Sequence, residues 1–217
     1  VLFFYSQDLS AKIAAIVIDY DTKEVLFEIN ADTRNYPASL TKMMTLYILF
    51  DNLKKDKLTE KTALYVSAEA ASRSPSKLFL EEGSTIKVKD ATLALIIKSA
   101  NDVATVVSEH ISGTERDFAK LMNKYAKNLG MKQTTFKNAS GLPNRAQMTT
   151  ARDMATLSHA LIKNFPDQYK LFSKKKFIWK GKTYKTHNKL MLNYKGADGI
   201  KTGYIKKSGF QLAFSAK

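Results

Sequence analysis

The sequence predicts an α+β fold, because strand-like segments occur near both ends of the chain and helical segments fill the middle. Alternating or continuously apolar runs, which are typical of strands, occur at residues 13–20, 24–30, 176–180 and 210–215. From about residue 58 to residue 172 the spacing of apolar residues is mostly helical. We therefore expect one antiparallel sheet built from both chain ends, with an all-helical insertion between them.

Length and patterning predict a single domain. With 217 residues, the chain can bury one sizeable core or two closely packed lobes. No internal repeat, low-complexity tract or linker divides it. We expect one domain over residues 1–217, with a sheet lobe at about 1–57 and 173–217 and a helical lobe at about 58–172.

The composition excludes several kinds of chemistry. The chain has no cysteine, which rules out disulfides, thiolate zinc sites and cysteine nucleophiles. Its net charge is +15, but only five of its 35 basic residues are arginine, the residue best suited to phosphates and base edges, and the lysines are scattered. We therefore predict no nucleic-acid partner. The three histidines are far apart and have no triad or metal spacing, so we also predict no metal site and no cofactor.

The first part of the chain predicts a hairpin followed by a central helix. Residues 13–20 are typical of a buried strand, and residues 24–30 of its partner across a turn at 21–23. Pro37 then marks a loop. The helix after it is apolar on nearly every face and ends near residues 51–56, and such a helix belongs in the middle of a domain.

Turn and capping residues divide the rest of the chain. Asp102 has the position of an N-cap, Thr150 caps a later helix, and Gly130 closes the helix between them. Tight turns are expected at Gly181 and at residues 206–209. The helices are predicted at 91–98, 103–111, 115–129 and 151–163, and the closing strands at 176–180, from 182 onward, at 199–204 and at 210–215.

Ser39 and Lys42 stand one turn apart where the apolar helix starts, so their side chains share a face. A hydroxyl becomes a nucleophile when a base takes its proton, and a desolvated neutral lysine can be that base. The spacing alone is weak evidence, because it recurs at residues 74–77 and 173–176 and because serine is a common helix cap. Of the three, only Ser39 begins a buried helix.

Two further motifs follow in the chain. Ser99 and Asn101 lie in a polar break between apolar helices, where side chains can face a cleft, although a plain turn gives the same pattern. Lys201, Thr202 and Gly203 lie in a strand-like run, where the glycine would let a ligand backbone approach, although an exposed strand edge also fits. The order of the three motifs is that of penicillin-binding proteins and class A β-lactamases.

On these motifs the chain resembles the low-molecular-weight D-alanyl-D-alanine carboxypeptidases, penicillin-binding serine peptidases that trim peptidoglycan stem peptides. The resemblance covers nearly all of the chain and includes PASLTKMMT, SAND, NASGLP, TTARDMA and DGIKTGY. It implies a β-lactamase/transpeptidase-like fold and one penicillin-binding catalytic domain. It also implies removal of the terminal D-alanine through an acyl-enzyme on Ser39, which penicillin would form as well.

The resemblance implies the catalytic roles. Ser39 would attack the carbonyl between the two terminal D-alanines, and Lys42 would accept its proton. Ser99 would pass a proton toward the leaving amine. The backbone N–H groups of Ser39 and Tyr204 would form the oxyanion hole.

The resemblance also implies the substrate-binding roles. Asn101 would hold the substrate amide and the catalytic lysine. Lys201 and Thr202, followed by Gly203, would face the terminal carboxylate of the substrate. The implied partners are peptidoglycan stem peptides, with β-lactams as covalent inhibitors, and the implied location is outside the cytoplasmic membrane, in the periplasm or on the membrane's outer face.

Three alternatives remain open at this stage. A D,D-endopeptidase of the same fold would cut cross-links rather than chain ends, a β-lactamase would turn over penicillin, and a non-catalytic module would only bind the wall. No Glu-x-x-Leu-Asn stretch follows Ser99, so the deacylating glutamate of class A β-lactamases has no evident counterpart. The family continues with a core strand, a helix and often a membrane-associating segment, so the C-terminal part of the family domain, with any peripheral membrane association, is expected to lie outside this sequence.

Overall fold

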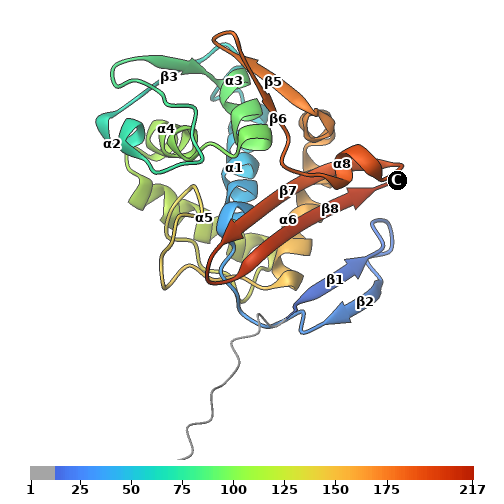
Figure 1. The fold of residues 1–217 in the computed structure, drawn as a ribbon. Coiled ribbons are helices and arrows are strands. Elements are labelled where there is room, and N and C mark those ends of the chain that lie inside the picture. Colours follow the sequence, from blue (N-terminus) through green and yellow to red (C-terminus); the bar gives the residue numbers. More distant parts are fainter. Residues whose placement is uncertain (1–12) are drawn as a thin grey trace, which may run out of the picture.

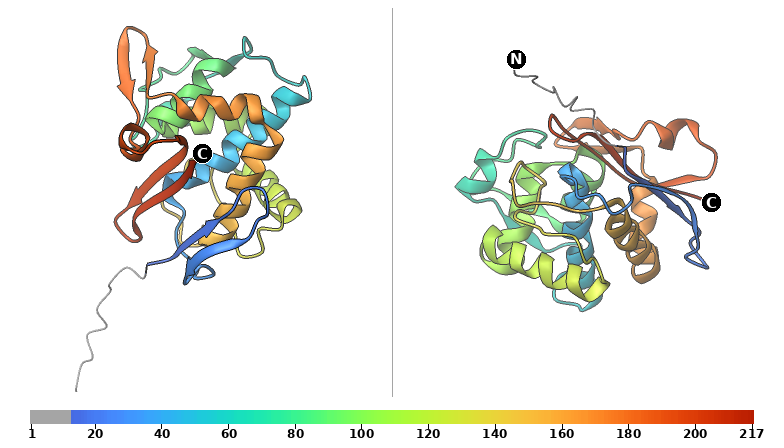
Figure 2. Two further views of the ribbon diagram at one scale, coloured as in Figure 1. Left: turned by 90° about the vertical axis from the view of Figure 1, so that its right-hand side faces the viewer. Right: turned by 90° about the horizontal axis from the view of Figure 1, so that it is seen from below.

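Helix α1 (Lys42–Lys54) lies at the centre of the computed structural model, which describes residues 13–217 (Figures 1 and 2). Every residue from Lys42 to Phe50 is buried, as expected for a helix that is apolar on nearly all faces. A 3₁₀ helix, η1 (Ala38–Thr41), leads directly into α1. Ser39 therefore lies in this tighter turn, just before α1, rather than in the first turn of α1 as predicted.

The helices of the middle of the chain surround α1, and α4, α5 and α6 all contact it. The predicted ends of α5 and α6 are confirmed: Gly130 closes α5 with a φ of 82°, and the Thr150 hydroxyl caps α6 by accepting from the Asp153 N–H. The bounds are α2 (Ala68–Ser72), α3 (Val88–Leu93), η2 (Ala94–Lys98), α4 (Asn101–Ser112), α5 (Glu115–Leu129), α6 (Ala151–Asn164), α7 (Pro166–Tyr169), η3 (Lys170–Ser173) and α8 (Leu190–Asn193).

The α+β class is confirmed, and all strands pair in antiparallel hairpins or short ladders. In β7 and β8, Lys201 pairs with Ala213 and Gly203 with Gln211. The strand bounds are β1 (Ala15–Ile18), β2 (Val25–Ile29), β3 (Ala63–Tyr65), β4 (Thr85–Lys87), β5 (Lys176–Trp179), β6 (Lys182–Lys185), β7 (Ala197–Ile205) and β8 (Gly209–Ala216).

The prediction of one sheet shared by both chain ends is wrong for the described residues. Strands β1 and β2 form one two-stranded sheet, whereas β7 and β8 form another. Both hairpins contact α6 and lie side by side (Figures 1 and 2). Within each hairpin the backbone groups that face the partner strand pair across a short turn, so each pair of strands forms without pairing between the hairpins. The predicted buried strand at 13–20 is also wrong, because every residue of β1 is at least partly exposed.

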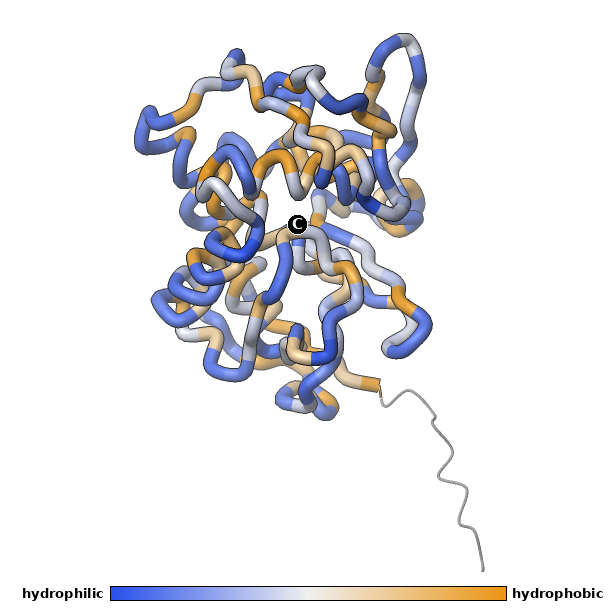
Figure 3. The backbone as a smooth tube through the Cα atoms, turned by 90° about the vertical axis from the view of Figure 1, so that its left-hand side faces the viewer, coloured by the Kyte–Doolittle hydropathy of each residue, from blue (hydrophilic) through white to orange (hydrophobic). Residues whose placement is uncertain are grey.

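Asp102 is not the N-cap of α4, which begins at Asn101, two residues earlier than that prediction requires, and has Ala100 as its N-cap. Its carboxylate is fully buried and accepts the backbone N–H groups of Leu78 and Leu80, each at 3.1 Å. It therefore anchors the neighbouring loop to α4 rather than capping its own helix. Figure 3 shows the matching distribution of hydropathy: the peripheral turns are mostly hydrophilic, and hydrophobic stretches recur along the inner helices. None of the helices within residues 13–217 combines the length and apolar character needed to cross a membrane.

We predict that Asp102→Ala lowers the free energy of unfolding by about 2–5 kcal/mol, because two buried N–H groups lose their acceptor. Urea unfolding followed by circular dichroism measures this loss. Glu82→Ala, which removes an exposed carboxylate, is the control and should change the stability by less than about 0.5 kcal/mol. Equal effects of the two substitutions would contradict an anchoring role for Asp102.

Candidate active site

The amine of Lys42 connects three segments that are far apart in the sequence. The side chain is fully buried, and Nζ donates to the Asn101 Oδ1 at 2.7 Å and to the Ser140 carbonyl oxygen at 2.6 Å. A third contact joins Nζ to the Ser39 Oγ at 3.2 Å. The start of α1, the start of α4 and the loop at residues 138–142 therefore meet at one nitrogen atom.

The surroundings of Lys42 favour its neutral form. Burial lowers the pKa of Lys42 well below its usual value, and the positive charge of Lys201 lowers it further, against smaller opposing effects of Asp102 and Glu115. Within residues 13–217 no carboxylate lies at salt-bridge distance from this amine. A neutral amine has two N–H donors and one lone pair. Asn101 and Ser140 offer only acceptor oxygens there, so the lone pair is left for the hydroxyl of Ser39.

The loop that leads into the Ser39 turn is hydrogen-bonded to two other segments of the chain. In the preceding loop, Asn35 and Thr149 exchange two backbone hydrogen bonds of 2.8 Å. The carbonyl of Tyr36 accepts from the Gln211 side chain on β8 and from the Ser208 hydroxyl at 3.3 Å. The loop before η1, residues 35–37, is therefore fixed to the β7–β8 hairpin and to the segment that leads into α6.

Gly203 lets β7 approach this turn. A Cβ added to Gly203 would lie 3.3 Å from the Ser39 backbone nitrogen and 3.3 Å from the Ala38 Cβ, tighter than most contacts of a real Cβ. The sequence predicts that Gly203 lets a ligand backbone come close. In the structure, the segment that comes close to it is η1 of the protein itself. The small residue brings the backbone of β7 close to the candidate nucleophile.

The Ser99–Asn101 turn joins η2, a short π-helical segment, to α4. Ser99 has a φ of 59° and a ψ of 40°, a left-handed conformation that is uncommon for a residue with a side chain. The Asn101 Nδ2 donates to the Ser74 carbonyl at 2.8 Å, which orients the amide so that its oxygen faces Lys42. The Ser99 Oγ is buried and has no hydrogen-bond partner in the described part of the chain, so it is free to contact a ligand.

Lys201 is buried in β7 beside these groups. Only 2% of it is exposed, and its Nζ donates to the Thr202 carbonyl at 3.1 Å. Burial lowers the pKa of Lys201 to about 7. A carboxylate placed next to this amine would favour its charged form, so the site is suited to an anionic group.

A cleft of about 810 Å³ is lined by six of the predicted site residues, whereas the buried Lys42 and Lys201 are not part of its lining. Its wall also includes His187, for which the sequence predicts no role. The pKa of His187 is lowered by burial and by the positive charges of Lys201 and Lys98. Tyr204 and Phe210 form an exposed aromatic pair at its edge, with ring centroids 4.7 Å apart. The predicted site residues that line the cleft are Ser39, Ser99, Asn101, Thr202, Gly203 and Tyr204.

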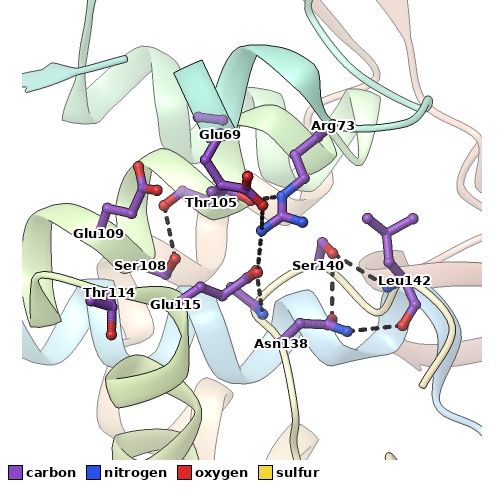
Figure 4. Close-up of polar contacts among 12 residues, drawn as sticks. Glu69, Arg73, Thr105, Ser108, Glu109, Thr114, Glu115, Asn138, Ser140 and Leu142 are labelled. Atoms are coloured by element: carbon purple, nitrogen blue, oxygen red, sulfur yellow. Dashed lines mark hydrogen bonds and ion pairs between the residues drawn. The ribbon is translucent and has the colours of Figure 1, made fainter. Parts of the chain in front are cut away.

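The loop at residues 138–142 is a part of the site that the predicted site residues do not include. The Asn138 side chain donates to the Leu142 carbonyl at 2.9 Å and accepts from the Gly141 N–H at 2.7 Å, so it closes the loop (Figure 4). Gly141 has a φ of +87°, and a Cβ there would lie 1.8 Å from the Ala38 carbonyl oxygen. The Ser140 contact to Lys42 uses a main-chain oxygen, which no side-chain pattern reveals. The glycine in NASGLP is the one signal in the sequence that marks this close approach.

We predict that Gly141→Ala destabilises the protein more than Gly130→Ala does. Both positions have positive φ, so each alanine carries about 1–2 kcal/mol of backbone strain. Only at Gly141 does the new Cβ also overlap a carbonyl, whereas nothing lies within 4 Å of it at Gly130. Urea unfolding of the two variants measures the difference, and equal midpoints would contradict the tight packing of this loop on η1.

Comparisons with known proteins agree with this geometry. The family model described as D-alanyl-D-alanine carboxypeptidase, Peptidase S11, matches residues 4–217. The chain is 38% identical over 213 residues to the D-alanyl-D-alanine carboxypeptidase DacF of Bacillus subtilis, with 94% of this chain and 54% of that protein covered. It is 38% identical over 210 residues to DacC of Escherichia coli, with 94% and 52% covered. The chain thus spans about half the length of these curated relatives.

Solved structures give the same assignment. The carboxypeptidase DacD from Francisella tularensis superposes with a TM-score of 0.93 at 31% identity, over 96% of this chain and 63% of that one. Penicillin-binding protein D2 from Listeria monocytogenes, in its ampicillin-bound form, superposes with a TM-score of 0.81 at 32% identity, over 97% and 86%. These matches confirm the predicted β-lactamase/transpeptidase-like fold, and the chain belongs to the D-alanyl-D-alanine carboxypeptidase family, Peptidase S11.

Proposed function

We propose that the protein is a serine-type D-alanyl-D-alanine carboxypeptidase that removes the terminal D-alanine of peptidoglycan stem peptides. The observation that carries this proposal is the buried amine of Lys42, which lies 3.2 Å from the Ser39 Oγ, 2.7 Å from the Asn101 Oδ1 and 2.6 Å from the Ser140 carbonyl oxygen. A lysine in this setting is a base rather than a counter-ion. Membership of the family supports the same reaction.

In the proposed reaction, Ser39 attacks the carbonyl carbon between the two D-alanines while its proton passes to Lys42. The negative charge that develops on the carbonyl oxygen is stabilised by the backbone N–H groups of Ser39 and Tyr204, and each such donor is worth about 3–4 kcal/mol of barrier. Ser99 relays a proton to the leaving amine, and D-alanine departs. A water molecule then hydrolyses the ester on Ser39 and restores the hydroxyl.

In the same proposal, the substrate is held by groups on both sides of the cleft. Lys201 and Thr202 bind its terminal carboxylate, and Asn101 contacts its amide while keeping Lys42 in place. The β7 backbone beside Gly203 runs along the substrate. The domain has a sheet lobe at about residues 1–57 and 173–217 and a helical lobe at about 58–172, and it works outside the cytoplasmic membrane, where stem peptides occur.

We predict that the protein releases D-alanine from a stem pentapeptide and gains the mass of one penicillin per chain. The penicillin should map by peptide digestion to the segment that contains Ser39, because a β-lactam imitates the D-alanyl-D-alanine terminus. Ser39→Ala and Lys42→Arg should abolish both reactions, since alanine has no nucleophile and arginine remains protonated. Intact-protein mass spectrometry and a D-alanine assay measure these outcomes.

The same assay separates the proposal from its rivals. Cleavage of cross-linked dimers without D-alanine release from the pentapeptide would identify an endopeptidase, and rapid loss of the penicillin adduct would identify a β-lactamase. An adduct on another serine, or none on a protein that circular dichroism shows to be folded, would refute the assignment of Ser39.

We also predict that acylation by penicillin slows as the pH rises through about 7. The pKa of Lys201 is about 7 in the free protein, so its amine is charged below this pH and loses the charge that binds the penicillin carboxylate above it. The second-order acylation constant reports groups of the free protein and shows this decline. Lys201→Arg stays charged and should lose the decline. An unchanged decline in that variant would assign it to another group.

A further inference from the structure

Each of the two hydrogen-bond acceptors of the Lys42 amine is fixed by hydrogen bonds to a neighbouring segment of the chain. The Asn101 amide is oriented by its 2.8 Å hydrogen bond to the carbonyl of Ser74. The Ser140 carbonyl follows Ala139, whose N–H donates to the Glu115 Oε1 at 3.0 Å and whose carbonyl accepts from the Thr45 hydroxyl at 2.7 Å. The position of the amine therefore depends on where the chain at 73–74 and the chain at 139–140 are fixed.

One ion pair connects these two segments. The guanidinium of Arg73, the residue before Ser74, contacts the Glu115 Oε2 through Nη2, and its Nε donates to the Thr105 Oγ1 at 2.9 Å (Figure 4). Both side chains are largely buried, with 21% of Arg73 and 15% of Glu115 exposed. Each oxygen of the Glu115 carboxylate thus has a different partner, one in each segment. The contacts form a closed ring that begins and ends at Lys42.

We propose that Arg73 and Glu115 are a positioning pair, which holds both acceptors of the Lys42 amine and sets the pH range in which Lys42 accepts the proton of Ser39. Neither residue touches the cleft, so both act through the segments that they join. The inference rests on the proposed function, because it concerns Lys42 as the base.

The charges around Lys42 give the pair an electrostatic effect that a purely structural link would lack. Lys201 on β7 faces the amine with positive charge, whereas Asp102 on α4 and Glu115 on α5 face it with negative charge. The negative charge of Glu115 raises the pKa of Lys42, and Arg73 offsets this charge. Removing Glu115 should therefore lower the pKa of Lys42, and removing Arg73 should raise it.

The test measures three variants, namely Glu115→Gln, Arg73→Gln and the double variant that combines these two substitutions. Each is compared with the control Glu69→Gln. Glu69 is the matched control, because its carboxylate also pairs with Arg73, at 2.9 Å, but makes no contact with the loop at 138–142 in the described chain. The acylation constant for penicillin, measured against pH, should fall about tenfold in each of the two single variants, with non-additive effects in the double variant, as for side chains in one network. Glu69→Gln should acylate as the parent protein does.

The pH profiles distinguish positioning from mere support of the fold. The rise in acylation with increasing pH follows deprotonation of Lys42, so it should move to lower pH in Glu115→Gln and to higher pH in Arg73→Gln. The proposal would be overturned if the pH profiles of the two variants coincide with the profile of the parent protein, or if both profiles move in the same direction. If one single variant fails to fold by circular dichroism, the predicted direction in the other remains a sufficient test.

A second readout is independent of acylation. In protein labelled with ¹³C-lysine, the ε-carbon signal of Lys42, assigned by its loss in Lys42→Arg, titrates with the amine itself. The titration should shift in the same opposite directions in the two variants and stay unchanged in Glu69→Gln. A parent protein that is not acylated would refute the proposed function, whereas unshifted Lys42 titrations would refute the positioning pair.

Discussion

A lysine amine buried without a carboxylate partner is the constraint on which the site depends. A charged amine in this place would lack the solvation that water gives it, and a second buried lysine adds like charge nearby. The neutral form avoids both costs, and its two N–H groups and one lone pair match the three contacts of Lys42. Burial disfavours the charged form of the amine, and the neutral form that results is the one that can accept a proton.

The start of α1 is buried because three other parts of the chain pack around it: the loop at 138–142, β7 and the turn at the start of α4. The loop at 138–142 packs so closely on η1 that only glycine fits at Gly141, and β7 lies so close that a Cβ at Gly203 would be crowded. Asp102 holds the segment at 78–80 on α4, next to the turn that contains Asn101. The anchors of the structure and the groups that surround Lys42 are therefore neighbours, so changes in packing here are felt at the amine.

The parts of the site that can be predicted from the sequence are those carried by side chains in short motifs. Ser39 and Lys42 share a turn, and the motif order adds Ser99, Asn101 and Lys201. The Ser140 carbonyl and the Ala139 N–H could not be predicted, because main-chain atoms are the same in every residue and depend on the tertiary fold. Helices with clear caps, such as α5, were predictable. The sheet topology was not, and the predicted single sheet is wrong for the described residues, since strand patterns do not say which strands pair across long separations.

The protonation state of Lys42 in the free protein is the central claim, and neutron diffraction from a deuterium-exchanged crystal near pH 7 tests it most directly. We expect two deuterium atoms on Nζ, directed at the Asn101 Oδ1 and the Ser140 carbonyl oxygen, and the deuterium of the Ser39 hydroxyl directed at Nζ. Three deuterium atoms on Nζ, with one directed at the Ser39 Oγ, would show a charged amine and would contradict the account.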